Sequence, residues 1–301
     1  MTKIGASITN VKSVKAANEI FTNFVNIDEL QSIASKRISK LFKSEAAVIT
    51  ASAAAGLTES VASMMTGNSI DKVYQLPNTK SMKNKVLIQR GHLTNYGAEV
   101  RQGIELSGAS IISCGQKNSC SLDAMQYTIL KHKKNICCAM YVVSHHCSDY
   151  EAVEISKFIK LCKKNNIPTI IDAASEEYME LFFKLNADVA IFSAHKFMGS
   201  LTAGILAGKK KYIKNIYLQN LGIGRGMKVG KEAIFSAIIG VEHWYKRNWK
   251  KEIDNQNRII KFWLNFLKKE KFNGITYEVV ADPTGNKINR LRLYVNPKKS
   301  N

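Results

Sequence analysis

Apolar and polar residues alternate in blocks along most of this chain. Short runs of apolar, largely β-branched residues predict buried strands, because such runs have no polar face. Between them lie stretches whose apolar residues recur every three or four positions, which predicts helices. This alternation is typical of an α/β fold with crossover helices and a mainly parallel sheet. Strands are expected over residues 46–50, 86–89, 110–113, 136–143, 167–172, 189–192 and 204–207, with helices ending near 65 and over 96–106, 122–131, 151–164 and 176–184.

The two ends of the chain show a different pattern. Residues 1–27 carry only a weak apolar pattern and are expected to form an N-terminal arm, and a helix is expected to follow with Asp28 as its N-cap. The polar stretch 68–85 predicts a loop. Beyond Gly208 the pattern predicts helices over 209–219 and 231–269, the second broken near 246–248, and then strands over 275–280 and 291–295.

These patterns predict one large domain and part of a second. We expect a large α/β domain over residues 28–245, followed over 246–301 by a linking helix and the start of a truncated C-terminal α+β small domain. The length of 301 residues suffices for such a domain with a modest appendage. No apolar stretch reaches the roughly 18 residues of a membrane span, and the first residues lack a signal peptide's apolar core. We therefore expect a cytoplasmic protein with no membrane partner.

Charge and cysteine content exclude several classes of site. The formal net charge is +20, but 36 of the 44 basic residues are Lys, and they are scattered over helical faces without aromatic residues between them. This distribution does not favour specific binding of RNA or DNA. The six cysteines include no Cys-x-x-Cys pair, so neither a disulfide framework nor a metal site is predicted.

Two reactive side chains directly follow predicted buried strands. Asp172 ends the strand 167–172, and Lys196 follows the strand 189–192. Because the carboxyl ends of parallel strands meet at the ligand crevice of an α/β sheet, we expect the two side chains to converge. A lysine can form a Schiff base with pyridoxal phosphate, and a carboxylate can keep its pyridine nitrogen protonated. The alternatives are an ordinary loop lysine and a helix-capping role for Asp172, although Ser175 is the better candidate for that cap.

Three further segments are candidates for binding anions or the cofactor ring. The small residues Ser52, Ala53 and Ala54 precede a helix, whose open N–H groups and dipole favour a phosphate. After the strand 86–89, His92 can stack on a cofactor ring while Arg90 or Thr94 reaches an anionic substrate, although a structural turn explains this segment equally well. The glycine-rich stretch 222–231 does not fit a dinucleotide motif. It predicts a flexible phosphate-binding loop containing Arg225 and Lys228.

Taken in order, these segments resemble fold-type I pyridoxal-phosphate enzymes. The resemblance is to the group that contains bacterial selenocysteine synthase (seryl-tRNA selenium transferase) and D-glucosaminate-6-phosphate ammonia lyase. It covers nearly the whole chain. The motifs that carry it are Phe24-Val-Asn-Ile-Asp-Glu-Leu-Gln31, Glu45-Ala-Ala-Val-Ile-Thr-Ala-Ser-Ala-Ala-Ala-Gly56, Arg90-Gly-His-Leu-Thr-Asn-Tyr-Gly97, Ile171-Asp-Ala-Ala-Ser-Glu-Glu177, Ser193-Ala-His-Lys196 and Gly222-Ile-Gly-Arg-Gly-Met-Lys-Val-Gly-Lys-Glu232.

The resemblance implies a role for each matching residue. It places a Schiff base on Lys196, Asp172 at the pyridine nitrogen and His92 near the ring, and it implies a homodimer or larger homo-oligomer. It places the cofactor phosphate at Ser52, Ala53, Ala54, Ser193 and His195, and a phosphorylated substrate or a neighbouring subunit near Arg225 and Lys228.

The group's activities then set the expected function. Its members usually have an additional N-terminal segment and a complete small domain, and selenocysteine synthase carries a tRNA-binding module that is not recognisable here. We therefore expect an ammonia lyase in which Lys196 removes the α-proton of a small phosphorylated amino acid or amino sugar acid, with loss of water and ammonia and release of a 2-keto acid. The alternatives are a transferase acting on seryl-tRNA, a partner we do not favour, and a truncated remnant without cofactor.

Overall fold

A seven-stranded sheet forms the centre of the larger unit of the chain. The computed structural model describes residues 5–298, which divide into one compact unit within residues 1–245 and another within 246–301. The strand order is β1-β7-β6-β5-β4-β2-β3, and β7 alone runs against the others, which confirms the predicted α/β fold with a mainly parallel sheet. The strands are β1 (Ala46–Thr50), β2 (Lys85–Gln89), β3 (Ser110–Cys114), β4 (Ile136–Val142), β5 (Thr169–Asp172), β6 (Val189–Ser193) and β7 (Gly204–Gly208).

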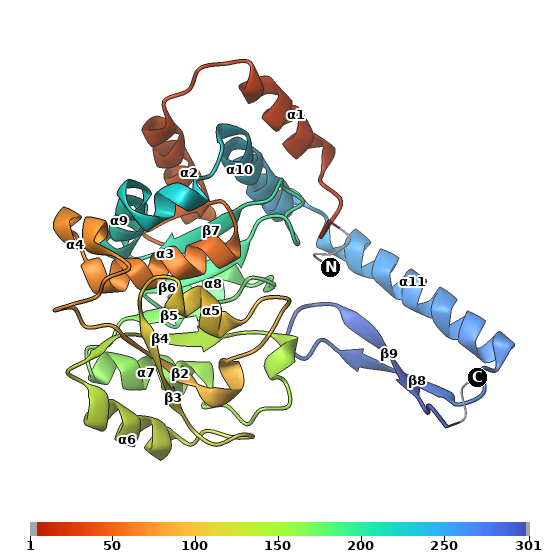
Figure 1. The fold of residues 1–301 in the computed structure, drawn as a ribbon. Helices are drawn as coiled ribbons and strands as arrows, with labels where there is room; N and C mark the ends of the chain where they lie inside the picture. The colour runs from red at the N-terminus through yellow and green to blue at the C-terminus, as the bar shows by residue number, and fades with distance from the viewer. Residues whose placement is uncertain (1–4, 299–301) are drawn as a thin grey trace. The chain divides into compact units, whose positions relative to one another are not determined.

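Helices cover both faces of this sheet (Figure 1). The path from β2 to β3 and the path from β3 to β4 run in opposite directions, so right-handed crossovers place their helices, α5 and α6, on opposite faces. On the α5 side, α3 packs against both α5 and α9, while on the α6 side α6 contacts α7, and α2 contacts α8. These helices are α2 (Ile27–Phe42), α3 (Ala53–Thr66), α5 (Val100–Glu105), α6 (Leu122–His132), α7 (Ile155–Lys164), α8 (Met179–Lys184) and α9 (Lys210–Leu218).

Close packing sets the position of α3 on the sheet. A Cβ atom added to Gly56 would lie 2.3 Å from Leu206 Cδ1, and one added to Gly204 would lie 2.4 Å from the carbonyl oxygen of Ser52. Gly204 therefore requires glycine, because a Cβ there would meet the backbone at the start of α3, whereas a Cβ at Gly56 would force the Leu206 side chain to move. Strands β1, β6 and β7 beneath it are buried along their whole length, as expected for strands covered on both faces.

Side chains from α2 protect the exposed edge of the sheet. Gln31 is buried, and its amide donates to the carbonyl oxygen of Ile49 at 2.8 Å and accepts from the Ile49 N–H at 3.0 Å. The Ser35 hydroxyl accepts from the Ala47 N–H at 3.0 Å. The backbone groups on the outer side of β1 have no neighbouring strand to pair with. The side chains of Gln31 and Ser35 provide hydrogen-bond partners for these groups instead.

The structure corrects several sequence expectations. The arm contains α1 (Val11–Phe21), and the predicted loop contains α4 (Ile70–Gln75). Asn26, and not Asp28, caps α2, because its side chain accepts from the N–H groups of Asp28 and Glu29. Helix α5 is shorter than expected and begins only at Val100.

The second unit consists of a long helix and a hairpin. Helix α10 (Lys231–Lys246) ends at Lys246, the first residue of the second unit, and α11 (Trp249–Glu270) begins after the N-cap Asn248, which confirms the predicted break near 246–248. Strands β8 (Ile275–Ala281) and β9 (Asn289–Val295) pair in antiparallel register. Asp282 organises the turn between them by accepting from the Thr284 N–H at 3.0 Å and pairing with Arg290.

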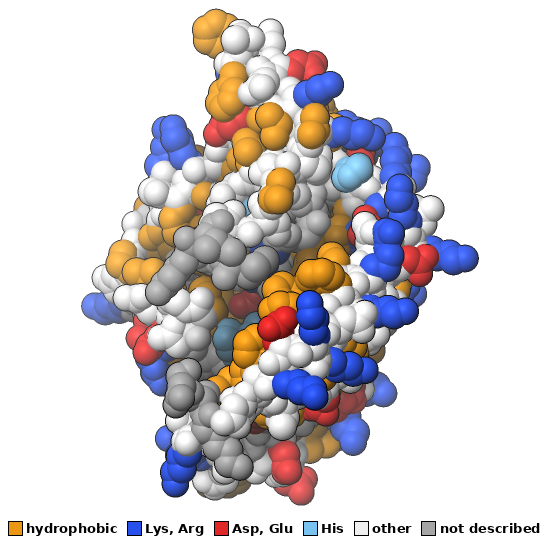
Figure 2. All heavy atoms as spheres, turned by 90° about the vertical axis from the view of Figure 1, so that its right-hand side faces the viewer, with side chains coloured by type: hydrophobic (Ala, Val, Ile, Leu, Met, Phe, Trp, Pro, Cys, Tyr) orange, Lys and Arg blue, Asp and Glu red, His pale blue; other side chains and the backbone are white. Residues whose placement is uncertain are grey.

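The structure also shows whether any helix could span a membrane and how charged side chains are distributed on one face. Among residues 5–298, no helix combines the length and apolar character needed to cross a bilayer. On the face shown in Figure 2, Lys and Arg side chains are most frequent along the right-hand side, with some acidic and apolar groups beside them.

The edge protection by Gln31 can be tested directly. Gln31→Ala leaves the N–H and C=O of Ile49 without their side-chain partners, so the free energy of unfolding should fall by about 1–3 kcal/mol. Urea unfolding followed by circular dichroism measures the change. The control is Lys36→Ala, which alters an exposed residue of the same helix and should change stability by less than about 0.5 kcal/mol. Equal effects of the two substitutions would show that the Gln31 bonds contribute nothing.

Candidate active site

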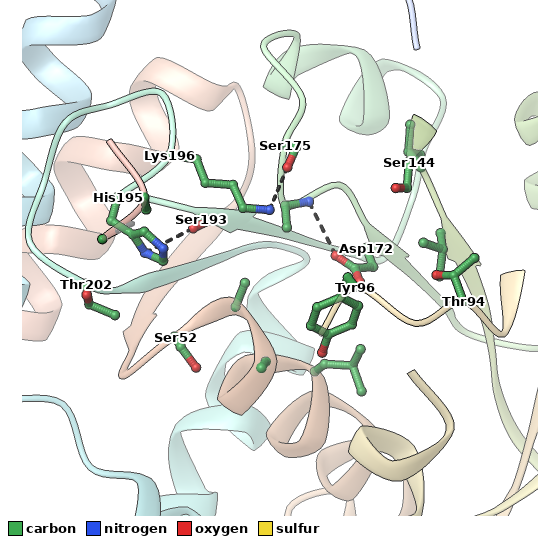
Figure 3. A pocket seen from close by; sticks show the side chains of 18 residues that line it. Ser52, Thr94, Tyr96, Ser144, Asp172, Ser175, Ser193, His195, Lys196 and Thr202 are labelled. Atoms are coloured by element: carbon green, nitrogen blue, oxygen red, sulfur yellow. Dashed lines mark hydrogen bonds between the residues drawn. The ribbon is translucent and has the colours of Figure 1, made fainter. Parts of the chain in front are cut away.

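A pocket of about 400 Å³ lies at the edge of the sheet where β1, β2, β4, β5 and β6 end and β7 begins (Figure 3). Its size falls in the usual range of small-molecule sites, about 300–1,000 Å³. The ends of the parallel strands supply most of its polar groups, as is general for open α/β sheets. Those polar residues are Ser52, Thr94, Tyr96, Ser144, Asp172, Ser175, Ser193, His195, Lys196 and Thr202.

Asp172 and Lys196 reach this pocket from neighbouring strands. Asp172 is the last residue of β5 and pairs with Ile191 of β6, while Lys196 follows β6 in a turn. The Asp172 Oδ1 accepts from the Ala174 N–H at 3.3 Å, and the Lys196 Nζ donates to Ser175 Oγ at 2.6 Å. The structure thus brings together the two groups that the sequence places after consecutive strands.

The pocket shifts the titration of both groups. Burial raises the pKa of Asp172 to about 6, against the opposing effects of the Ala174 N–H and the Lys196 charge. Burial also lowers the pKa of Lys196, although the carboxylates of Asp172 and Glu176 oppose this shift. A lysine with a lowered pKa is neutral more of the time and is therefore a better nucleophile.

The start of α3 forms one wall of the pocket and suits an anion. Ser52 is the N-cap, and its Oγ accepts from the Ala55 N–H at 3.0 Å, while Ala53 and Ala54 line the pocket beside it. The first N–H groups of a helix have no intrahelical partner, and the helix dipole adds positive potential there. Across the pocket, Ser193 Oγ lies 3.2 Å from His195 Nδ1. All five residues predicted to bind the cofactor phosphate therefore line this pocket.

His92 lies outside the pocket lining, which corrects the expectation that it faces a cofactor ring. Strand β2 ends at Gln89, and a 3₁₀ turn over Arg90–His92 brings the imidazole to the backbone at the end of the neighbouring strand β4. There His92 is 1 % exposed, accepts from the Val142 N–H at 3.3 Å and contacts the Tyr141 ring edge-on at a centroid distance of 4.4 Å. Burial lowers its pKa to about 4.

Four polar lining residues did not enter the sequence prediction. Tyr96 follows β2 and lies beside Asp172 in Figure 3, and burial together with the charge of Asp172 raises its pKa. Ser144 follows β4, Thr202 precedes β7, and Ser175 binds Lys196. The first three follow or precede predicted strands on the same edge, so strand position could have identified them. Ser175 was expected to cap a helix, but α8 begins only at Met179, after Tyr178.

The predicted substrate-binding residues are not all brought to the pocket. Thr94 lines it. Arg90, Arg225 and Lys228 are exposed and lie outside the lining. The glycine-rich stretch forms a 3₁₀ segment over Ile223–Met227, and Gly222 lies so close to Val73 that an added Cβ would approach its carbonyl oxygen to 2.7 Å.

No cysteine of the described residues lines this pocket. The six cysteines are free thiols, and all except Cys147 are buried. Within the described residues, no group of three or more His, Cys, Asp or Glu side chains is arranged to hold a metal ion.

Comparison with known families agrees with this geometry. Residues 1–257 match the family model described as SelA, L-seryl-tRNA selenium transferase. The chain belongs to the SelA family. The resemblance stated from the sequence motifs is thereby confirmed.

Members of the SelA family and their relatives differ in their reactions. The chain is 28% identical over 298 residues to D-glucosaminate-6-phosphate ammonia lyase of Salmonella typhimurium (strain 14028s / SGSC 2262), covering 98% of this chain and 78% of that protein. It is 25% identical over 299 residues to 5'-C-glycyluridine monooxygenase-decarboxylase of a Streptomyces species, covering 98% and 73%. A solved structure of D-glucosaminate-6-phosphate ammonia-lyase superposes with a TM-score of 0.83 at 28% identity, covering 99% of this chain and 79% of that one.

Pyridoxal phosphate is the cofactor of this family, as predicted. The pocket fits the cofactor in three respects. It offers an amine of lowered pKa, a carboxylate on the neighbouring strand, and a helix N-terminus lined by small residues that a phosphate can approach closely.

The charge of Asp172 should control how cofactor affinity depends on pH. An ionised Asp172 would attract a protonated pyridine nitrogen, and burial raises the pKa of Asp172 to about 6. Binding should therefore weaken as the pH falls through 6. Asp172→Asn should weaken binding by about 10- to 100-fold at pH 7.5 and remove this part of the pH dependence. Absorbance titrations of both proteins from pH 5 to 8 measure the effect. Identical pH profiles would exclude the contact.

His92 should affect stability through its protonation. Unfolded His92 titrates near 6.5 and folded His92 near 4, so the unfolded chain binds more protons between these values and stability is lost as the pH falls through this window. His92→Gln keeps an acceptor for the Val142 N–H but does not titrate. Between pH 7 and 5, the wild type should lose about 2 kcal/mol more stability than this variant in urea unfolding. Parallel losses would mean that His92 is not buried in its neutral form.

Proposed function

We propose that this protein is a pyridoxal-phosphate-dependent lyase that eliminates water and ammonia from an amino sugar acid phosphate and releases a 2-keto acid. The main support is the likeness to D-glucosaminate-6-phosphate ammonia lyase over nearly the whole chain, at 28% identity and a TM-score of 0.83. The pocket chemistry agrees with it, since a lysine and a carboxylate occupy neighbouring strand ends.

Different residues of the pocket would bind different parts of the cofactor. Lys196 would bind the cofactor covalently, and Asp172 would pair with its ring nitrogen. Ser52, Ala53 and Ala54 on one side, with Ser193 and His195 on the other, would hold its phosphate. When bound, pyridoxal phosphate withdraws electrons from the α-carbon of an amino substrate.

Lys196 is also suited to act as the base that removes the α-proton of the substrate. The Lys196 amine, released when the substrate binds, would take the proton from the substrate α-carbon, because its lowered pKa keeps it neutral more of the time. The ammonium that forms can give this proton to the departing hydroxyl group, which leaves as water. The enamine product would then take up one water molecule and hydrolyse to the 2-keto acid and ammonia, so the net loss from the substrate is ammonia.

Recognition of the substrate phosphate would require more than one chain. Thr94 lines the pocket, but the cations Arg90, Arg225 and Lys228 are exposed outside its lining. Their positions support the proposal that the protein works as a homodimer or larger homo-oligomer, in which Arg225 and Lys228 of one subunit serve the site of another.

A second candidate function is the transfer reaction on seryl-tRNA. The match of residues 1–257 to the L-seryl-tRNA selenium transferase family favours it. The distribution of the lysines along the sequence does not favour it, because they are not clustered or interleaved with aromatic residues as in many RNA-binding segments.

Purified protein mixed with pyridoxal phosphate should develop a visible absorption band, and Lys196→Ala should remove it and reduce keto-acid release by at least about 100-fold. The assay uses D-glucosaminate 6-phosphate, with unphosphorylated D-glucosaminate as the control substrate and Lys36→Ala as the control variant. A band that persists in Lys196→Ala would contradict the role of this lysine. Salt-sensitive binding of seryl-tRNA, without keto-acid release from either sugar acid, would favour the transferase instead.

A further inference from the structure

Ser175 lies in a turn that is bonded firmly to the strand carrying Lys196. After β5, the Ala173 N–H donates to the Ile191 carbonyl oxygen at 3.0 Å, and the Ser193 N–H donates to the Ala174 carbonyl oxygen at 3.2 Å. The turn closes on itself through the Glu176 N–H, which donates to the Ala173 carbonyl oxygen at 3.1 Å. The backbone at Ser175 therefore has little freedom to move relative to β6.

The Ser175 hydroxyl holds the end of the Lys196 side chain. Lys196 Nζ donates to Ser175 Oγ at 2.6 Å, and Figure 3 shows this bond at the wall of the pocket, beside the Asp172 carboxylate. Lysine has a flexible four-carbon stem, so its amine stays in one place only when a partner holds it. Here that partner is on a rigid turn of the neighbouring strand.

We propose that Ser175 is a positioning residue for Lys196. It holds the amine in the pocket whenever the amine is not bound to the cofactor, and it stabilises the ammonium form by accepting one of its N–H bonds. The consequence for catalysis rests on the proposed function. In that reaction Lys196 takes a proton from the substrate α-carbon, and Ser175 holds the resulting ammonium until it passes the proton to the departing hydroxyl group.

Several charged groups act on Lys196 together with Ser175. The carboxylates of Asp172 and Glu176 favour the ammonium, while burial disfavours it. His195 comes from the same turn as Lys196, and burial, together with the positive charge of Lys196, lowers the pKa of this imidazole. Because all three groups remain in a Ser175 variant, a change in the titration of Lys196 reports the loss of the hydroxyl contact.

The first test needs no cofactor. Competitive labelling with acetic anhydride across a pH series, followed by mass spectrometry of the peptide that contains Lys196, gives the pKa of this amine alone. Ser175→Ala should lower that pKa by about one unit, which corresponds to a tenfold loss in stabilisation of the ammonium. Ser175→Thr keeps a hydroxyl and should restore the wild-type value. Ser32→Ala, in an exposed position on α2, is the matched control and should leave the pKa unchanged.

The second test uses the loaded enzyme. Ser175→Ala should reduce kcat about tenfold and change KM by less than about twofold, because Ser175 positions the proton-transfer group. Ser175→Thr should recover most of the rate. Ser175→Cys, whose thiol is a weak acceptor, should give an intermediate labelling pKa and replaces the alanine variant if that protein does not fold.

The outcomes separate this inference from the proposed function. A labelling pKa of Lys196 that is the same in the wild type, Ser175→Ala and Ser175→Cys overturns the role of Ser175, even if the enzyme is an active lyase. Conversely, a shifted pKa in a protein whose cofactor band does not depend on Lys196 supports the contact with Ser175 and contradicts the proposed function.

Discussion

The parallel pairing of β5 with β6 is the constraint on which the site depends. It sets Asp172 opposite Ile191, so the carboxylate ends one strand where the next strand continues toward Lys196. A slip of one residue in this register would turn the Asp172 side chain to the other face of the sheet. The same pairing fixes the Ser175 turn, because its backbone bonds run to β6. The position of the amine, the charge beside it and the hydroxyl that holds it thus have one structural origin.

Much of the fold is predictable from the sequence because the sheet is covered on both faces. Continuous apolar runs then indicate strands, and all seven strands of the sheet were located within a few residues. Other elements leave no comparable signal. Helix α1 buries small residues such as Ala16 and Ala17, and α4 buries only Val73, so neither shows a clear apolar stripe. The reversed direction of β7 is explained by its connection from β6, residues 194–203, which is too short for a helical crossover.

The candidate site was predictable where function follows strand ends, and not where it depends on turns. Asp172, Lys196 and the start of α3 were placed correctly because a parallel sheet brings these ends together. His92 was not placed correctly, because a 3₁₀ turn after β2 brings its ring to the backbone at the end of β4, and sequence pattern does not encode that direction. Ser175 resembled a helix cap because capping residues and turn residues are the same types. Contacts between these turns become visible only in three dimensions.

The central claim is that Lys196, among 36 lysines, is the residue placed to bind the cofactor opposite Asp172. Most of the other lysines in the described part of the chain are exposed and lie outside the lining of this pocket. The most direct measurement is borohydride reduction of the protein with pyridoxal phosphate, followed by mass mapping of its peptides. The account predicts a stoichiometric pyridoxyl group on the peptide that contains Lys196. Labelling that is spread over surface lysines, or absent from Lys196, would contradict it.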